Sequence, residues 1–389
     1  MPVRVGKKWM PWLGIGLVLV ALAVGMFALP VRSAGPMYTR QERFGIAFVS
    51  EVPEGDHIVL QSISEYNVAP LQVGWYSDWK YSATPAMPAD ATLEYVQLIR
   101  VGDSAWPPDW DAVRNAVLLN PGALWIIGNE PECPNQDAVT PETYAERYHE
   151  AYTRIKGWDM TAQIAIGGIV EPTPLRLRWL EKAMQAYEAA YGSPMEVDVW
   201  NIHVQILEEE RPGNDRAGAG VPVGIDPQAE GLFPLPVPDD LSFYTDVQIF
   251  KEMVRGFRGW MKTHGQQDKP LIISEMGVLM PSIYLVEGGT EQERKERGDQ
   301  LIEQFMVQVF DWLLHTTDEE LGCPSDEYRL VQRWLWFSLN GSFWDETDNR
   351  RGFNGSLYDY KTKELTRFGR RFVSYQNQVI KLYMPFVKK

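Results

Sequence analysis

The sequence predicts an α/β protein of the (β/α)8 barrel class, preceded by one hydrophobic N-terminal helix. Eight short apolar segments recur at a spacing of roughly 40 residues, and segments of helical period separate most of them. This alternation is typical of parallel βαβ units. A doubly wound open sheet is the alternative fold. It usually carries a glycine-rich first turn, and this sequence has none.

The eight predicted strands are mostly continuous apolar runs, as expected of strands that are buried on both faces. They span residues 43–49, 71–77, 93–99, 124–128, 163–170, 197–204, 270–275 and 331–339. Helical patterns follow the third to the eighth strand, at residues 110–120, 140–157, 173–192, 243–265, 291–315 and 364–383. The second unit is the weakest, because only the short segment 83–90 separates its strand from the third.

Residues 1–34 differ from the rest of the chain. The uncharged run Met10–Pro30 is long enough to span a bilayer, which takes about 20 apolar residues, and three basic residues precede it. Those basic residues favour a cytoplasmic N-terminus, so residues 35–389 are expected to form one extracellular catalytic domain. A cleaved signal peptide is the alternative. Arg32 stands where a cleavage site needs a small residue, which favours an uncleaved membrane anchor.

The composition excludes several classes of partner. The net charge of −15 argues against nucleic acid as a partner. The five histidines and two cysteines show no spacing typical of a zinc site, so neither metal nor cofactor is expected. Cys133 follows the fourth strand and Cys323 precedes the eighth. A barrel would place them at opposite ends, too far apart for a disulfide.

Two glutamates end strongly apolar strands. Glu130 follows the fourth strand in "LWIIGNEPE", and Glu275 ends the seventh in "PLIISEMG". A barrel places both at the carboxyl ends of its strands, where barrel enzymes carry their chemistry. Glycoside hydrolysis needs such a pair, because one carboxyl group protonates the leaving oxygen while the other attacks or activates water.

These motifs resemble the clan A glycoside hydrolases, which are retaining (β/α)8 barrels. The resemblance rests on "GNEP" and "ISEMG" at strands four and seven and on the later segment "GSLYDYKTKELTRFGRRF". It implies that Glu130 is the acid/base, that Glu275 is the nucleophile, and that Asn129 binds the sugar 2-hydroxyl. It also implies a carboxyl separation of roughly 5–5.5 Å.

The resemblance further implies a role for residues near the ends of two other strands. His203 ends the sixth strand, where several branches of the family place a histidine close to the nucleophile. Trp336 in the eighth strand matches the aromatic floor under the sugar, and Trp344 just beyond it is the second choice.

Other candidates follow from the residue types alone. Several aromatic residues follow the second and third strands, among them Trp79. Trp75 and Trp106 are taken as the candidate sugar platforms, because aromatic rings cover the C–H faces of sugars. The sixth loop, residues 207–241, is long enough to act as a lid or binding loop. Glu132 is expected to be a loop residue close enough to influence Glu130.

The sequence therefore predicts a retaining glycoside hydrolase that acts on a β-linked oligosaccharide or polysaccharide and is attached to the membrane by its N-terminal helix. A non-catalytic carbohydrate-binding protein on the same fold and a cell-surface transglycosylase are the alternatives. A metal-dependent hydrolase that uses Glu130, Glu132 and His203 is a further alternative.

Overall fold

The computed structural model describes residues 36–210, 218–236, 241–344 and 352–383. These residues belong to one compact unit, Ser33–Lys389. The predicted N-terminal anchor lies outside the described residues, as do two parts of the sixth loop. Within the described ranges, no helix is both long and apolar enough to cross a membrane.

Every predicted strand is present, most of them shorter than expected. The barrel strands are β1 (Phe44–Ala47), β4 (Trp75–Ser77), β5 (Glu94–Tyr95), β6 (Gln97–Ile99), β7 (Leu124–Asn129), β8 (Gln163–Gly168), β9 (Trp200–Val204), β10 (Leu271–Met276) and β11 (Arg333–Trp336). The predicted third strand is divided into β5 and β6 by a single residue, Val96.

The strands pair in parallel around a ring. One sheet has the order β5-β4-β1-β11-β10-β9, and another has the order β6-β7-β8. Val96 connects β5 to β6, and two isolated parallel bridges, Ala165–Val199 and Ile169–Ile202, connect β8 to β9. This order is consistent with the predicted (β/α)8 barrel and differs from that of an open doubly wound sheet.

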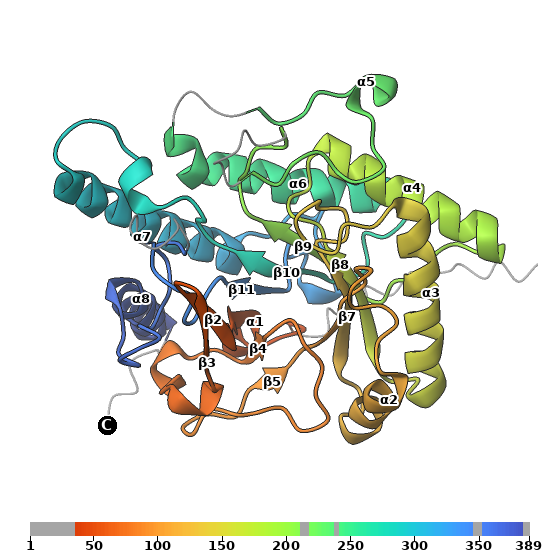
Figure 1. Cartoon of the computed structure of the whole chain (residues 1–389), viewed down its shortest axis with the longest axis horizontal. Coiled ribbons are helices and arrows are strands. Elements are labelled where there is room, and N and C mark those ends of the chain that lie inside the picture. Colours follow the sequence, from red (N-terminus) through yellow and green to blue (C-terminus); the bar gives the residue numbers. More distant parts are fainter. Residues whose placement is uncertain (1–35, 211–217, 237–240, 345–351, 384–389) are drawn as a thin grey trace, which may run out of the picture. The chain divides into compact units, whose positions relative to one another are not determined.

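Six long helices surround the strands (Figure 1). They are α2 (Trp110–Leu119), α3 (Pro141–Trp158), α4 (Pro174–Tyr191), α6 (Val247–Thr263), α7 (Glu291–His315) and α8 (Arg367–Tyr383). Their starts follow the sequence signals. The Thr140 hydroxyl accepts from the Thr143 N–H at the start of α3, and Thr290 forms a capping box with Glu293 at the start of α7. All six agree with the predicted helical segments.

The first two units lack such helices. After β1 the chain forms an antiparallel hairpin of β2 (Glu51–Glu54) and β3 (His57–Leu60), followed by the short helices η1 (Ile63–Glu65) and η2 (Ala69–Leu71). The weak second unit contains no helix between β4 and β5. The remaining short elements are α1 (Arg40–Arg43), α5 (Pro227–Glu230), η3 (Leu241–Thr245), η4 (Ser282–Tyr284) and η5 (Pro324–Asp326).

The apolar core has two parts. A small cluster fills the barrel interior and includes Trp75, Ile126 and Leu335, while a much larger one lies between the strands and the helices. Cys133 and Cys323 are both buried and free, as predicted. The rigid, doubly packed strands hold the residues at their carboxyl ends in fixed positions.

Candidate active site

Glu130 lies in a tight turn at the end of β7. Its backbone has φ +44°, a left-handed conformation that costs a non-glycine residue on the order of 1 kcal/mol. Gly128, two residues earlier, has φ +98°. The Glu130 N–H donates to the Gly168 carbonyl at 2.9 Å, which ties the turn to the neighbouring strand β8. The strand and this hydrogen bond therefore fix the direction of the Glu130 side chain.

Glu275 is placed by an irregularity in β10. The register between β10 and β9 pairs Ile273 with Ile202 and then Glu275 with His203, so Ser274 is an extra residue on its strand. Such a bulge redirects the side chains that follow it. It places Glu275 beside His203 at the carboxyl end of the sheet.

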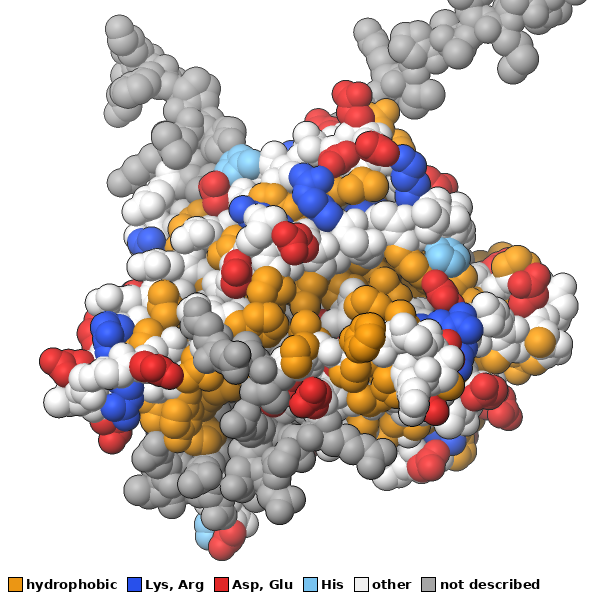
Figure 2. Space-filling view, turned by 90° about the horizontal axis from the view of Figure 1, so that it is seen from above, with side chains coloured by type: hydrophobic (Ala, Val, Ile, Leu, Met, Phe, Trp, Pro, Cys, Tyr) orange, Lys and Arg blue, Asp and Glu red, His pale blue; other side chains and the backbone are white. Residues whose placement is uncertain are grey.

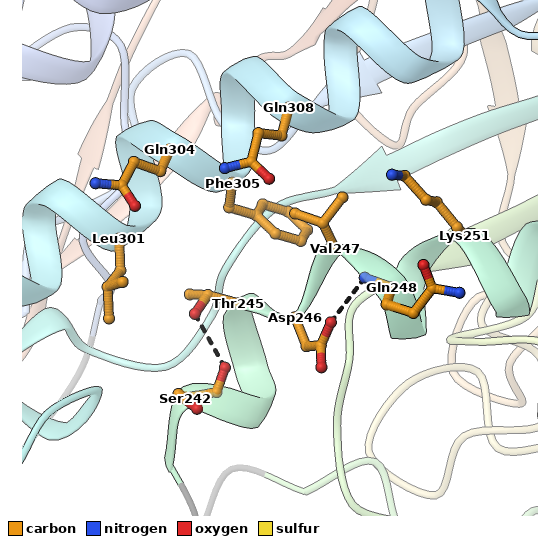
Figure 3. A pocket seen from close by; sticks show the side chains of 10 residues that line it. All are labelled: Ser242, Thr245, Asp246, Val247, Gln248, Lys251, Leu301, Gln304, Phe305 and Gln308. Atoms are coloured by element: carbon orange, nitrogen blue, oxygen red, sulfur yellow. Dashed lines mark hydrogen bonds between the residues drawn. The ribbon is translucent and has the colours of Figure 1, made fainter.

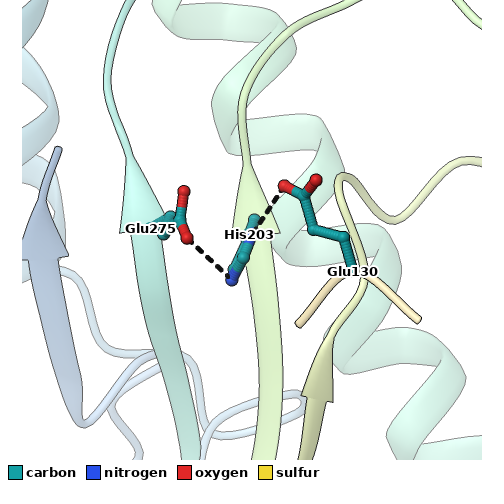
Figure 4. Close-up of side chains that lie close together, drawn as sticks. All are labelled: Glu130, His203 and Glu275. Atoms are coloured by element: carbon teal, nitrogen blue, oxygen red, sulfur yellow. Dashed lines mark hydrogen bonds and ion pairs between the residues drawn. The ribbon is translucent and has the colours of Figure 1, made fainter. Parts of the chain in front are cut away.

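His203 lies between the two glutamates (Figure 4). Its Nδ1 is 2.9 Å from Glu130 Oε1, and its Nε2 is 3.0 Å from the Ser274 hydroxyl and 3.8 Å from Glu275 Oε1. The imidazole ring of His203 packs against the backbone of Gly168. A side chain at residue 168 would collide with it, because a Cβ there would lie 2.4 Å from His203 Cδ2. One ligand atom from each of Glu130, His203 and Glu275 lies within 4.8 Å of the others. The structure thus brings together both predicted catalytic residues and the predicted histidine.

Burial and neighbouring charges shift the acid–base properties of this group. The pKa of Glu275 is raised to about 7, and burial is the largest cause. The charge of Glu130 raises this pKa further, while the charge of His203 and the hydrogen bonds from Trp79 and Gln205 lower it. Burial lowers the pKa of His203. The charge of Glu275 and the hydrogen bond to Glu130 outweigh burial, so the His203 pKa is raised overall. The pKa values of His203 and Glu275 are therefore both raised in this arrangement.

The Glu275 carboxylate has two further donors. The indole N–H of Trp79 donates to Oε1 at 2.5 Å, and the amide of Gln205 donates to Oε2 at 3.5 Å. Gln205 lies two residues after His203, so it extends the same face of the chain. The sequence pattern drew attention to Trp79 only as one of several aromatic residues after the second strand, and it gave no indication of Gln205.

A cavity of about 500 Å³ opens beside the two carboxylates, which is within the usual size range of a ligand site. It is lined by polar and apolar side chains, among them Trp79, Arg100, Asn129, Glu130, Glu275 and Phe337. The Arg100 charge is paired with Asp137 at 2.5 Å. In the space-filling view, acidic and basic side chains are interspersed around a broad hydrophobic area on one face of the molecule (Figure 2).

Asn129 lines this cavity, as its predicted role requires. Its amide N–H₂ points to Gln136 Oε1 at 3.4 Å, while its buried Oδ1 has no hydrogen-bond partner. The predicted contact with a sugar hydroxyl stays a prediction.

Two of the predicted aromatic platforms are wrong, because the structure buries both rings. Trp336 is fully buried, donates to the Gly355 carbonyl at 2.9 Å and packs edge-on against Phe310 of α7. Trp75 is fully buried in the barrel interior, and its indole N–H points to the Arg43 carbonyl at 3.4 Å. Both rings stabilise the barrel and neither lines the cavity.

The other two predicted aromatics also lie outside the cavity lining. Trp106 packs edge-on against Trp110 and lies 5.9 Å from the Arg147 guanidinium. Trp344 packs edge-on against Tyr284 at a centroid distance of 5.8 Å. The aromatic residue that does line the cavity from the eighth unit is Phe337, one position after Trp336. Phe337 packs against Trp79 at 5.6 Å.

A second buried charge cluster lies behind the turn that carries Glu130. Arg176 of α4 binds Glu132 Oε1 at 3.0 Å and the Gly220 carbonyl at 2.8 Å, and its Nε is 3.7 Å from Glu209 Oε1. Glu171 completes the group, and all four charged side chains are fully buried. Burial raises the pKa of Glu132 and raises that of Glu171 well above its ordinary value. Glu132 is thus a structural carboxylate, although its charge is close enough to interact with Glu130, as predicted.

The cluster fastens the described parts of the sixth loop. The Gly220 carbonyl is bound by Arg176, the Val223 N–H donates to the Glu132 carbonyl at 2.8 Å, and the Leu235 N–H donates to Glu209 Oε2 at 2.7 Å. Leu207, Gly218 and Ala219 line the cavity. The sixth loop therefore forms part of the cavity wall, as its length suggested.

A different hollow, of about 420 Å³, lies between η3, the start of α6 and α7 (Figure 3). Its lining includes Asp246, Gln304 and Gln308. Asp246 accepts from the Gln248 N–H at 2.7 Å as the N-cap of α6, so its carboxylate is engaged in the fold. This hollow offers no second carboxylate, and the chemistry is better placed beside Glu130 and Glu275.

Comparison with known proteins identifies similarity over part of the chain. Residues 51–210 match the family described as glycosyl hydrolase catalytic core. The matched region contains β7 and Glu130 but ends before β10 and Glu275. Comparison with curated proteins gave no significant match.

Two solved structures share the fold. A GH128 (subgroup II) endo-β-1,3-glucanase from Pseudomonas viridiflava has 14% identity and a TM-score of 0.50, over 85% of this chain and 97% of its own. A GH128 (subgroup VII) oligosaccharide-binding protein from Cryptococcus neoformans has 14% identity and a TM-score of 0.50, over 89% and 98% of the two chains. Residues 51–210 are therefore similar to the catalytic core of glycosyl hydrolases, and the chain shares the fold of these two GH128 proteins.

Proposed function

We propose that this protein is a retaining glycoside hydrolase that cleaves a β-linked glucan. The observation that carries the proposal is the group Glu130, His203 and Glu275 beside a 500 Å³ cavity. Cleavage of a glycosidic bond generally requires two carboxyl groups that face the same cavity. The glucan is suggested by the endo-β-1,3-glucanase whose fold the chain shares.

The spacing of the carboxylates favours retention of configuration. One oxygen of Glu130 and one of Glu275 lie within 4.8 Å of each other. Inverting enzymes hold their carboxyl groups about 6.5–9.5 Å apart, because a water molecule must fit between the sugar and the base. The shorter spacing leaves room for direct attack by one carboxylate.

In the proposed mechanism, Glu275 attacks the anomeric carbon while Glu130 gives its proton to the leaving oxygen. Water then attacks the glycosyl-enzyme, and Glu130 takes back a proton. His203 contacts both carboxylates, so it supports the opposite protonation states that the first step requires. The cavity also suits a neutral sugar, since the Arg100 charge is already paired with Asp137.

The test is release of reducing ends from β-1,3-glucans, mixed-linkage β-glucans, cellulose, xylan and chitin. Glu275→Gln should abolish turnover, while Glu188→Gln, at an exposed position of α4, should match the wild type. NMR should show the first product with the anomeric configuration of the substrate. Inverted product would remove the retaining mechanism, and glycan binding without cleavage would favour a carbohydrate-binding protein instead.

A further inference from the structure

We propose that Trp79 is a positioning residue for the nucleophile: its indole N–H holds Oε1 of Glu275 and leaves Oε2 as the attacking oxygen. This inference rests on the proposed function and goes beyond it, because it separates the tasks of the two carboxylate oxygens.

The two oxygens of Glu275 have unequal surroundings. Oε1 accepts from the Trp79 indole at 2.5 Å and lies 3.8 Å from His203 Nε2. Oε2 has a single long contact, from the Gln205 amide at 3.5 Å. A short hydrogen bond to a carboxylate draws electron density to the bonded oxygen and restrains rotation of the group. Oε2 is therefore the oxygen that is free to form the bond to the anomeric carbon.

Trp79 is itself held in place from two sides. Its backbone has φ +60°, a left-handed conformation that few non-glycine residues adopt. Its ring packs edge-on against Phe337, with 5.6 Å between centroids and an interplanar angle of 64°. It also packs against the apolar cluster of the barrel interior. The indole direction is thus set by the scaffold before any substrate enters.

Trp79 also lines the cavity, so one side chain contacts both the nucleophile and the space for the ligand. A tryptophan that merely filled space could be replaced by phenylalanine with little effect on Glu275. A tryptophan that positions Glu275 could not be replaced in this way, because phenylalanine keeps a ring against Phe337 but has no N–H to donate to the carboxylate. Trp79→Phe therefore separates the two roles.

The first experiment measures the pH dependence of kcat/KM for Trp79→Phe. Loss of a hydrogen bond to a charged group should lower kcat/KM about 10- to 100-fold. The bond to Trp79 lowers the pKa of Glu275, so its loss should move the acid limb of the profile upward by about one pH unit. Trp260→Phe is the matched control, since the Trp260 indole also donates to a glutamate, Glu181, at 3.1 Å on the outer helices. It should leave the acid limb unchanged.

A second experiment needs no enzymatic activity. Unfolding free energies of the wild type, Trp79→Phe, Glu275→Gln and the double variant are measured from pH 5 to pH 8. Trp79→Phe should make the unfolding free energy depend more strongly on pH than it does in the wild type. The double variant should not show this increase, because it lacks the Glu275 carboxylate. Equal pH dependence in the wild type and Trp79→Phe would overturn the proposal. Failure of the wild type to cleave any glycan would overturn the proposed function. The unfolding measurements would still test the hydrogen bond between Trp79 and Glu275.

Discussion

The Nδ1 atom of His203 lies 2.9 Å from Oε1 of Glu130. The opposite ring nitrogen faces Ser274 and Glu275, so one imidazole contacts the proposed acid and the proposed nucleophile. Because both carboxylates depend on this ring, its removal should change the ionisation of the site as well as its shape.

Replacement of His203 by asparagine should raise the pKa of Glu275, because the charge of His203 lowers it. Glu275 must be ionised to attack, so activity should begin to fall at a higher pH as the solution is acidified. We expect a loss of about 10- to 100-fold in kcat/KM at neutral pH. The check is the pH profile of kcat/KM, with His264→Asn, at the end of α6, as the control. An acid limb that stays in place would contradict this role of His203.

Glu275→Gln should stabilise the fold, and more so at alkaline pH. The folded protein raises the pKa of Glu275 from 4.5 to about 7, so the folded state binds the extra proton between these values. The stability of the wild type therefore decreases as pH rises through this window, and the loss remains above pH 7. Glutamine has no such loss. Urea unfolding should show a difference of roughly 1–3 kcal/mol at pH 8 and little at pH 4.5.

The buried cluster behind the active site should be very sensitive to loss of its one arginine. Arg176→Met leaves Glu132, Glu171 and Glu209 without their cation, which should cost about 3–5 kcal/mol of unfolding free energy at pH 8. Acidification should reduce the loss, because burial raises the pKa of Glu132 and Glu171 and these two carboxylates can then protonate. Arg178→Met, on the same helix with partly exposed partners, should cost less than about 1 kcal/mol. Equal effects at pH 5 and pH 8 would show that the charges are not the cause.

Phe337, rather than Trp336, should contribute to substrate affinity. Phe337→Leu keeps an apolar side chain in the cavity wall but removes the ring, and should raise KM about 3- to 30-fold. Trp336→Phe should lower the melting temperature and leave KM unchanged, since Trp336 is fully buried against α7. A raised KM in Trp336→Phe, with an unchanged KM in Phe337→Leu, would instead support Trp336 as the aromatic floor under the sugar.

Glu130→Ala should discriminate between leaving groups. A substrate with a poor leaving group needs the proton of Glu130, and should lose roughly 100- to 10,000-fold in kcat. An activated aryl glycoside needs little protonation, so its loss should be far smaller. Parallel kinetics on the two substrates provide the measurement, and equal losses would contradict the acid/base role.

Sequence patterns predicted the arrangement of the strands and the proximity of Glu130 and Glu275. Strands buried on both faces and helices with clear caps give strong local signals, and Glu130 and Glu275 stand out because a carboxylate rarely ends such an apolar run. The eighth strand shows the limit of this approach. In "WLWF" all four residues are apolar, so no alternation reveals which rings face the helices. The structure turns Trp336 outward and Phe337 toward the cavity.

Contacts between distant segments were harder to foresee. The bulge at Ser274 shifts the register by one residue, and no local signal marks it. Trp79 and Gln205 meet Glu275 only because three different units converge at one end of the ring. The partners of Glu132 likewise come from other units, so its burial could not be read from its own loop.

The buried cluster has a consequence for how this protein can diversify. Glu132 is two residues from Glu130, and through Arg176 it is joined to the backbone of Gly220, the residue after Ala219 of the cavity wall. Changes that reshape the wall near Ala219 would therefore displace Glu130 as well. Leu235, in the later part of the loop, is joined to the same cluster through Glu209. Variation in both described parts of the loop is therefore expected to require matching changes in the turn that carries Glu130.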